Sequence, residues 1–271
     1  MDDIERFLME DLSTQGDITS KALFTDECGD AEIIVKESCV VAGITELEAV
    51  FHRTGAKTEI LVKDGMCIKK NTCIAKISGS MISILSGERL ALNILGRMSG
   101  IATQTKRIVD LCKECNPKVS IAATRKTTPG FRKYEKKAVE IGGGEPHRFG
   151  LFDAVLIKDN HIKKTGSIQL AISRVLQTIP DKVIEVEVKN EKDALLAAQT
   201  KVEWIMLDNF SANNAKKITI KIRRINSSVR IEVSGGITPN NCQSYATFAD
   251  RISLGFLTHT IQNIDFALNM A

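Results

Sequence analysis

The sequence predicts an α/β protein in which an N-terminal α+β domain precedes an incomplete parallel β/α barrel of the TIM-like kind. Two observations lead to this prediction. In the second half of the chain, six apolar runs of strand length alternate with segments suited to helices. Such runs, apolar on both faces, are typical of parallel strands covered by helices. Polar or glycine residues follow each run, and the carboxyl ends of barrel strands are where active sites form.

Length and composition set the broad class of protein. The 271 residues suffice for one large domain or two smaller ones, and the apolar fraction of 43% and charged fraction of 26% are ordinary for a globular protein. No apolar run approaches the ~20 residues that span a membrane, and Asp2 and Asp3 stand where a signal peptide would be basic. Seven cysteines, an odd number, form no disulfide-like framework. We therefore expect a cytoplasmic protein with no membrane partner.

The first part of the chain has a mixed pattern of helices and strands. Residues 1–25 predict helix, loop and helix, with Asp2 as the cap of the first helix. Strand-like runs follow at residues 31–36, 58–62 and 66–77. One helix is predicted between the first two of them, at residues 46–53, and it ends at Gly55. We place this domain at residues 1–101, with the C-terminal residues 260–271 packed against it.

A long helix is predicted over residues 86–115, where apolar residues recur at helical spacing. Gly96 and Gly100 interrupt the pattern and indicate either a close contact or a break. Arg89 lies near the predicted start, where the helix dipole disfavours a cation. Arg89 is therefore either paired with Glu88 or placed for a ligand.

The barrel domain is expected over residues 102–259. Its predicted strands are residues 119–123, 154–157, 183–188, 204–207, 229–233 and 252–254, with a further β/α unit considered near Glu140. Helices are predicted between them at residues 167–177, 192–199, 211–225 and 239–248. The residues that follow the strands are Thr124-Arg125-Lys126, Lys158, Glu187, Asp208-Asn209, Ser234-Gly235-Gly236 and Gly255, with His259 just beyond. Because the strand ends of a barrel share one face, we expect these residues to line a single cavity.

Positive charge is concentrated in one region of the chain. Residues 123–164 hold ten Lys and Arg against five Asp and Glu, a surplus larger than the net charge of +4 on the whole chain. The same region contains His147, His161 and the run Gly142-Gly143-Gly144. A solvated basic face would show the same charge run. Combined with the polar strand ends, however, the pattern favours a site for a small, densely anionic substrate.

The strand ends suggest two halves of that site. Glycines after the last two strands let backbone N–H groups approach a phosphate, since they carry no Cβ. Glu187 and Asp208 offer oxygen ligands for Mg²⁺ or acceptors for ribose hydroxyls. The facing wall is cationic and consists of Arg125, Lys126, His147, Arg148 and Lys158. We expect a phosphorylated sugar and a second part that carries several carboxylates.

Several segments match a known family in its order along the chain. They are GERLALNILGRMSGIAT, TRKTTPGFRKYEKKAV, GGGEPHR, LIKDNHI, EVEV, MLDN, VSGGI and ISLGFLTH. Together they closely resemble quinolinate phosphoribosyltransferases, the carboxylating nicotinate-nucleotide pyrophosphorylases of NAD synthesis, from about Glu10 onward. The resemblance implies an N-terminal α/β domain, an incomplete barrel, Mg²⁺ and no organic cofactor. It also implies that quinolinate and phosphoribosyl pyrophosphate give nicotinate mononucleotide, pyrophosphate and CO₂.

The resemblance also implies residue roles. Quinolinate would be bound by Arg125, His147, Arg148 and Lys158, joined by Arg89 from the partner subunit. Phosphoribosyl pyrophosphate would be bound by Lys126, Glu187, Asp208, Ser234, Gly235, Gly236, Gly255 and His259. Lys126, Glu187 and Asp208 would be catalytic, and the two carboxylates would hold the metal. The expected assembly is a homodimer with shared active sites, and a higher oligomer is an open alternative.

Three other functions were weighed against this one. A paralogue associated with molybdate transport is expected to lack the intact Lys-Asp-Asn-His and Glu-Arg-x-Ala-Leu-Asn motifs present here. A nicotinate phosphoribosyltransferase binds a single carboxylate, for which four or five cations are excessive. An RNA-binding protein could use the basic residues 123–164, but aromatic residues are only 5% of the chain and no stacking motif is visible. We therefore expect no nucleic-acid partner.

Overall fold

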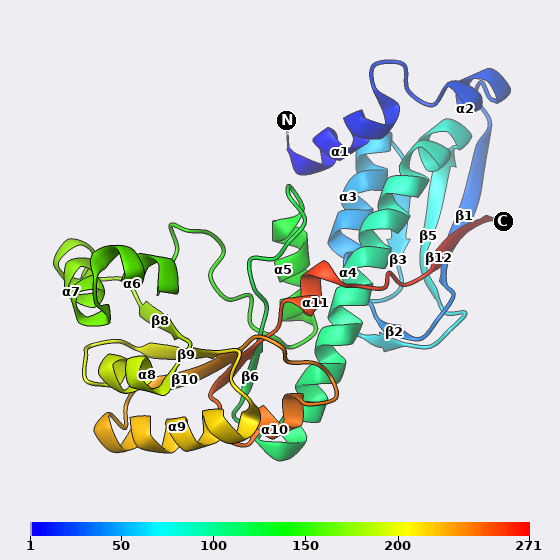
Figure 1. The fold of residues 1–271 in the computed structure, drawn as a ribbon. Coiled ribbons are helices and arrows are strands. Elements are labelled where there is room, and N and C mark those ends of the chain that lie inside the picture. The colour runs from blue at the N-terminus through cyan, green and yellow to red at the C-terminus, as the bar shows by residue number, and fades with distance from the viewer. Residues whose placement is uncertain (1) are drawn as a thin grey trace. The chain divides into compact units, whose positions relative to one another are not determined.

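The computed structural model describes residues 2–271 and divides into two compact units (Figure 1). One unit contains the chain up to Lys106, Lys133–Gly142 and Thr260–Ala271, and the other contains Arg107–Arg132 and Gly143–His259. The division expected at residue 101 falls inside helix α4, Met81–Cys115, which contributes to both units. Within residues 2–271, no helix combines the length and the apolar character that crossing a membrane requires.

The first unit is built on a four-stranded antiparallel sheet of order β12-β1-β5-β3. Its strands are β1 Cys28–Val35, β3 Lys57–Ile60, β5 Cys73–Ser80 and β12 Phe266–Met270, and β2 Cys39–Val40 pairs separately with β4 Cys67–Ile68. Its helices are α1 Asp3–Leu12, α2 Ile18–Leu23, α3 Ile44–Thr54, the first part of α4 and most of α5 Arg132–Ile141. The C-terminal strand β12 pairs with β1, so the last residues of the chain complete the sheet of the first unit.

Side chains at the helix ends explain where the first helices begin and end. Asp2 Oδ1 accepts the Glu5 N–H at 2.9 Å, and Glu5 Oε2 accepts the Asp2 N–H at 3.0 Å. This reciprocal capping box confirms the cap predicted at Asp2. Asp17 caps α2 through the N–H groups of the next turn. Gly55 ends α3 with a φ of 93°, in the left-handed region that favours glycine.

The start predicted for helix α4 is wrong. The helix begins at Met81 rather than at residue 86. Ser80 Oγ accepts the Ser83 N–H at 3.1 Å and so caps the earlier start. Arg89 is therefore more than two turns inside the helix, where the dipole of the N-terminus no longer acts on it. Its exposed side chain carries no electrostatic penalty of the kind predicted.

The glycines of α4 mark a close contact, one of the two alternatives left open by the sequence. A Cβ on Gly96 would lie 2.8 Å from the carbonyl oxygen of Ile264, and one on Gly100 would lie 2.3 Å from that of Gln262. The Ile264 N–H donates to the Gly96 carbonyl at 3.0 Å. The segment that precedes β12 therefore crosses α4 backbone to backbone, which a larger residue at either position would prevent.

Helix α5 occupies the place where a further β/α unit was considered. Its Glu135, fully buried, accepts from Arg97 Nε of α4 at 2.8 Å. Lys137 of the same helix pairs with Glu46 at 2.8 Å. These ion pairs explain why most of α5 belongs to the first unit rather than to the barrel. After α5, the chain joins the end of β6 through an isolated parallel bridge between Ala122 and Glu145.

The second unit holds a six-stranded parallel sheet of order β6-β11-β10-β9-β8-β7 (Figure 1). Its strands are β6 Ser120–Ala122, β7 Val155–Ile157, β8 Ile184–Val188, β9 Trp204–Asp208, β10 Arg230–Ser234 and β11 Arg251–Ser253. Its helices are α6 Asp159–Thr165, α7 Ile168–Thr178, α8 Glu191–Ala198, α9 Ala212–Ile225, α10 Cys242–Ala246 and α11 Phe256–His259. The first strand of the unit in sequence, β6, pairs with the last, β11. The two edges of the described sheet are β6 and β7, which would have to pair with each other to close a barrel. The predicted incomplete barrel is confirmed.

Alternation along these strands separates an apolar face from a polar one. Val186, Ile205, Ile231 and Ile252 are fully buried in the hydrophobic core of this unit. Successive side chains of a strand point to opposite faces. The intervening positions, which face the interior of the partial barrel, include Glu185, Glu187, Asp208, Glu232 and Ser234. The polar interior is therefore built into the strands themselves.

Candidate active site

A cavity of about 720 Å³ lies at the carboxyl ends of the barrel strands, with lining residues from all six strand ends. Twelve of the thirteen predicted site residues line it: Arg125, Lys126, His147, Arg148, Lys158, Glu187, Asp208, Ser234, Gly235, Gly236, Gly255 and His259. The predicted convergence of the strand ends is thus confirmed. Arg89 is the exception and lies on α4 in the first unit.

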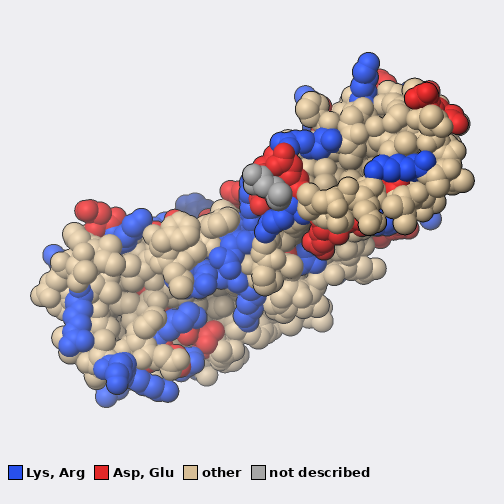
Figure 2. Space-filling model, turned by 90° about the horizontal axis from the view of Figure 1, so that it is seen from above, with Lys and Arg blue, Asp and Glu red and all other residues tan. Residues whose placement is uncertain are grey.

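The cationic side of the cavity is formed by residues outside regular strands. Arg125 follows β6, and Arg148 lies in the segment before β7. Burial lowers the pKa of the Arg148 guanidinium, and the charge of Arg125 lowers it further. The buried Nε of Arg125 has no hydrogen-bond partner among the described residues. Figure 2 shows Lys and Arg side chains at many places on the face drawn, interspersed with Asp and Glu. Two neighbouring guanidiniums with unused N–H donors suit the binding of a planar anion that carries more than one hydrogen-bond acceptor.

The acidic side of the cavity comes from the ends of β8 and β9. Lys158 Nζ donates to Glu187 Oε2 at 2.8 Å, and Asn209 Nδ2 donates to Asp208 Oδ2 at 2.7 Å. Burial raises the pKa of Asp208, and the negative charge of Glu187 raises it further. Two carboxylates that repel each other in this way favour a cation or a hydroxyl donor between them. The oxygens of Glu187 and Asp208 therefore fit either a divalent cation or the hydroxyl groups of a ligand.

Two glycines on the rim leave room that a side chain would fill. Gly235 has a φ of 82°, and a Cβ there would lie 2.9 Å from the backbone nitrogen of Asn209. At Gly255 a Cβ would lie 2.9 Å from Lys126 Cδ and 3.1 Å from His259 Cδ2. The absence of side chains thus keeps backbone N–H groups accessible after β10 and leaves the path of Lys126 open after β11.

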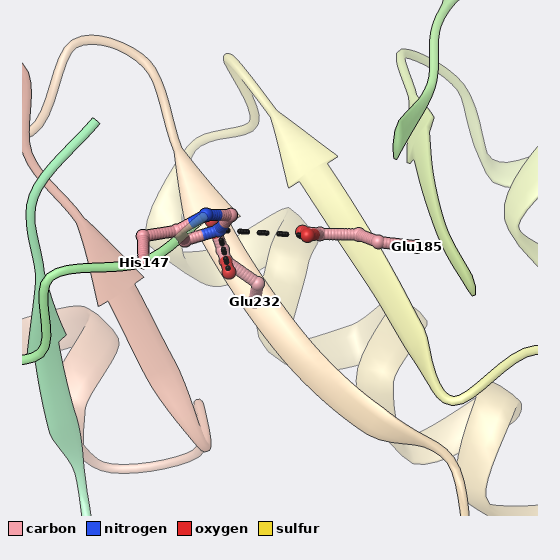
Figure 3. Close-up of side chains that lie close together, drawn as sticks. All are labelled: His147, Glu185 and Glu232. Carbon is pink, nitrogen blue, oxygen red and sulfur yellow. Dashed lines mark hydrogen bonds and ion pairs between the residues drawn. The ribbon is translucent and has the colours of Figure 1, made fainter. Parts of the chain in front are cut away.

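A buried polar cluster borders the cavity, and two of its members, His147 and Glu232, also line it (Figure 3). His147 Nε2 is 3.2 Å from Glu232 Oε2 and 3.5 Å from Glu185 Oε2. Burial, the largest influence, lowers the pKa of His147, but the two carboxylates outweigh it and raise that pKa to about 9. The Arg148 N–H donates to Nδ1 at 2.8 Å and opposes this rise, since protonation of Nδ1 would remove the acceptor.

Sequence reasoning gave no role to several polar residues at or next to the cavity, among them Glu185, Glu232 and Asn209. Glu185 and Glu232 were passed over because only the last polar residue of each strand was considered. Their signal is the spacing of two in E-V-E-V and R-I-E-V-S, which puts an acidic side chain on the same face as the strand-end residue. Asn209 was noted at a strand end but given no role; its φ of 61° and its bond to Asp208 identify it as a support for that carboxylate.

The chain matches models of two protein domains that together span most of its length. The N-terminal domain of quinolinate phosphoribosyl transferase matches residues 17–99, and the C-terminal domain of the same enzyme matches residues 101–269. These matches meet within α4, where the two structural units also divide.

Individual relatives are similar over nearly the whole chain. A probable nicotinate-nucleotide pyrophosphorylase (carboxylating) of Archaeoglobus fulgidus is 43% identical over 258 residues, which cover 94% of this chain and 98% of that protein. Its Bacillus subtilis counterpart is 36% identical over 271 residues, covering 98% and 92%. The crystal structure of nicotinate-nucleotide pyrophosphorylase from Ehrlichia chaffeensis superposes with a TM-score of 0.93 at 39% identity, covering 99% of this chain and 97% of that one. The chain belongs to the quinolinate phosphoribosyltransferase family.

Proposed function

We propose that this protein transfers the phosphoribosyl group of phosphoribosyl pyrophosphate to quinolinate. Decarboxylation then gives nicotinate mononucleotide, with pyrophosphate and CO₂ as the other products, in de novo NAD biosynthesis. The observation that carries this proposal is the division of one cavity into a cationic wall and a wall of carboxylates and glycines. Relatives named for this activity match almost the full chain.

Quinolinate fits the cationic wall. It is a planar dianion at neutral pH, and its two carboxylates need charge-assisted partners when they leave water. Arg125 and Arg148 provide guanidinium forks, Lys158 provides a point charge, and His147 lines the same cavity. Binding of the dianion would also relieve the repulsion between the two arginines, which adds to burial in lowering the pKa of Arg148.

Phosphoribosyl pyrophosphate fits the opposite wall. The Ser234-Gly235-Gly236 loop and Gly255 offer backbone N–H groups to the 5′-phosphate, while Lys126 and His259 lie beside them. Glu187 and Asp208 would hold Mg²⁺ or accept from ribose hydroxyls. When bound, Mg²⁺ would neutralise charge on the departing pyrophosphate. Lys158 would exchange its bond with Glu187 for a substrate carboxylate.

The chain need only place the two substrates and stabilise charge. As the bond between ribose C1 and pyrophosphate breaks, positive charge develops on the ribose, and the carboxylates of Glu187 and Asp208 face it. The pyridine nitrogen of quinolinate attacks C1. The carboxyl group beside the now cationic ring nitrogen leaves as CO₂, the electron pair of the broken bond stays on the ring carbon next to the positive charge, and a proton from solvent then replaces the carboxyl group. This sequence calls for no protein nucleophile and no organic cofactor.

The assembly and location remain part of the proposal. Arg89, exposed on α4, is offered to the site of a second copy, which makes the functional unit a homodimer with shared active sites. The protein would act in the cytoplasm, without nucleic acid or membrane partners.

A single assay tests the function. Purified protein with Mg²⁺, quinolinate and phosphoribosyl pyrophosphate should release pyrophosphate and CO₂ in equal amounts and form nicotinate mononucleotide. Nicotinate in place of quinolinate should give little product. Preferred turnover of nicotinate, or no turnover together with salt-dependent RNA binding, would replace this proposal with one of its alternatives.

A further inference from the structure

Around His147, the interior of the barrel holds charged groups that the proposed chemistry does not use. Glu232 is fully buried, and the side chains of Glu185 and His147 are only 6% and 10% exposed. Arg251 Nη1 donates to Glu232 Oε2 at 3.0 Å. Charges buried this deeply are costly unless each has a partner. These four residues, here called the buried cluster, therefore have to be held in a definite arrangement.

Arg251 is the fixed point of the buried cluster. Its guanidinium carbon lies 3.7 Å from the centre of the Trp204 ring, and its Nε is 3.0 Å from Glu145 Oε2. Stacking on one side and ion pairs on two others leave a planar guanidinium little freedom. Glu232 Oε2, which accepts from Arg251, is the same oxygen that faces His147 Nε2. Glu232 thus joins a fixed cation to the histidine of the cavity floor.

His147, Glu185 and Glu232 form the one group of three potential metal ligands found within residues 2–271. A metal is nevertheless a poor occupant. The Arg148 N–H lies 2.8 Å from Nδ1 of His147, so the ring carries a proton on Nε2 both in its neutral form and in the charged form that a pKa of about 9 favours. A protonated Nε2 cannot ligate, and the Arg251 cation already compensates Glu232. The geometry is that of a histidine held by hydrogen bonds on both nitrogens.

The backbone at His147 needs such support. Its φ of 54° lies in the left-handed region, which costs a residue with a side chain about 1–3 kcal/mol unless its surroundings fix it. In this conformation the backbone N–H of the next residue, Arg148, donates a hydrogen bond to Nδ1 of the His147 ring. The orientation of the ring and the direction of the Arg148 side chain are therefore set together.

We propose that Glu232 is a positioning residue, whose Oε2 oxygen, anchored by Arg251, fixes the His147 ring and thereby directs Arg148 into the cationic wall. The assignment rests on the proposed function, since it treats Arg148 as a ligand of a quinolinate carboxylate. A guanidinium fork gains most from a carboxylate when both N–H groups align with both oxygens. Displacing such a group by about 1 Å can cost on the order of a hundredfold in rate.

The chain offers a matched pair of variants. Glu232→Met removes the shared oxygen at nearly constant side-chain length. Glu145→Met makes the same change at the other carboxylate that pairs with Arg251. Within the described chain, no hydrogen bond or ion pair joins Glu145 to His147. Glu232→Gln keeps an oxygen acceptor and should retain the function. Glu232→Asp, which withdraws the oxygen by one methylene, serves if the Met variant does not fold.

Two measurements are made on the matched pair. In steady-state kinetics, Glu232→Met should raise KM for quinolinate by about ten- to a hundredfold, with KM for phosphoribosyl pyrophosphate within about twofold of wild type. Glu145→Met and Glu232→Gln should leave both constants within a few-fold. The second measurement is an NMR spectrum of protein labelled with ¹⁵N at its four histidines. The protected Nε2–H signal of His147 should be present in wild type and in Glu145→Met. It should be lost in Glu232→Met.

The outcomes separate this assignment from the proposed function. If wild type does not turn over quinolinate, the proposed function fails, while the NMR comparison still tests whether Glu232 holds His147. Equal increases in both KM values, the same loss in Glu145→Met, or an unchanged His147 signal in Glu232→Met would overturn the positioning role. So would a Zn²⁺ titration that shifts the His147 signal in wild type and not in Glu232→Met, because the three residues would then be a metal site.

Discussion

The two walls of the cavity differ in how their side chains are held before any ligand binds. On the acidic wall, Glu187 and Asp208 end neighbouring strands, and each accepts a hydrogen bond from a nearby side chain. On the cationic wall, Arg125 and Arg148 come from connecting segments, and the Nε of Arg125 is buried without a partner. Parallel strands fix the first pair by register, whereas the second pair depends on side chains packed beneath it.

The difference indicates how each wall responds to its ligand. A carboxylate that enters the cationic wall supplies acceptors that the wall lacks, so binding there satisfies groups that are already desolvated. A ligand at the acidic wall must displace Lys158 from Glu187 or bring a cation. We therefore expect quinolinate binding to depend steeply on single arginines and phosphoribosyl pyrophosphate binding to depend on metal and on several weaker contacts.

The largest effect is expected from Arg148→Ala. Removing one partner of a buried ionic interaction costs about 3–5 kcal/mol, which corresponds to a loss of roughly a hundredfold to several thousandfold in quinolinate affinity. Binding of phosphoribosyl pyrophosphate with Mg²⁺, measured by calorimetry, should change little. Lys163→Ala, which removes an exposed cation from α6 outside the cavity, is the control and should have no effect on either ligand. Equal losses for both ligands in Arg148→Ala would show that the walls do not act separately.

The double variant Glu187→Gln with Asp208→Asn should produce the next largest effect. The amides keep the shape of the acidic wall but remove both charges, so the Mg²⁺ concentration for half-maximal rate should rise by about ten- to a hundredfold. Quinolinate binding in the absence of Mg²⁺ should not weaken. A Mg²⁺ titration that matches wild type would confine the two carboxylates to ribose contacts or to structural roles.

A smaller effect is expected where the walls meet at Gly255. Gly255→Ala would place a methyl group 2.9 Å from Lys126 Cδ, and the flexible lysine would move aside. KM for phosphoribosyl pyrophosphate should rise by on the order of tenfold, the loss of about one charge-assisted hydrogen bond. If the effect passes through Lys126, then Gly255→Ala should add nothing to Lys126→Ala in a double-mutant cycle. Additive effects would mean that the methyl group acts through His259, 3.1 Å from it, or through the backbone of residue 255.

The acidic wall was predictable from the sequence because strand register does most of the placement. Glu187, Asp208 and Ser234 each end an apolar run, and parallel pairing brings the ends of such runs to one edge. The same logic located Arg125, three residues beyond β6, and Lys158, one residue beyond β7.

Other features depend on contacts that no spacing reveals. The support of His147 joins β8, β10 and β11 through contacts between side chains that lie 19 to 85 residues apart in sequence. The left-handed backbone of His147 has no signature in a residue other than glycine. The early start of α4 depends on the single hydroxyl of Ser80, in a stretch of β-branched and serine residues that favours helix only weakly. The placement of α5 depends on ion pairs with Arg97 and Glu46.

The cationic wall is expected to be completed by Arg89 of a second copy of the chain. Arg89 is the predicted ligand that does not line the cavity, and it is exposed on α4. If a second copy supplies it, Arg89→Ala and Arg125→Ala should each be inactive alone. Unfolded together in equal amounts and refolded, half of the dimers should be mixed, and each mixed dimer has one intact and one doubly altered site. Activity should return to about a quarter of wild type, by counting for random two-fold pairs.

The chain provides an internal control for this counting. Arg125→Ala mixed with Arg148→Ala should recover nothing, because both residues belong to the same chain's cavity and every site in a mixed dimer keeps one defect. Arg89→Ala mixed with Arg148→Ala should behave like the first mixture. Recovery in all three mixtures would point to refolding artefacts, and recovery in none, with mixed dimers present by mass spectrometry, would place Arg89 outside the site. A quarter of wild-type activity in only the two mixtures that contain Arg89→Ala would mean that the cationic wall is completed across a two-fold axis, while the acidic wall is complete in one chain.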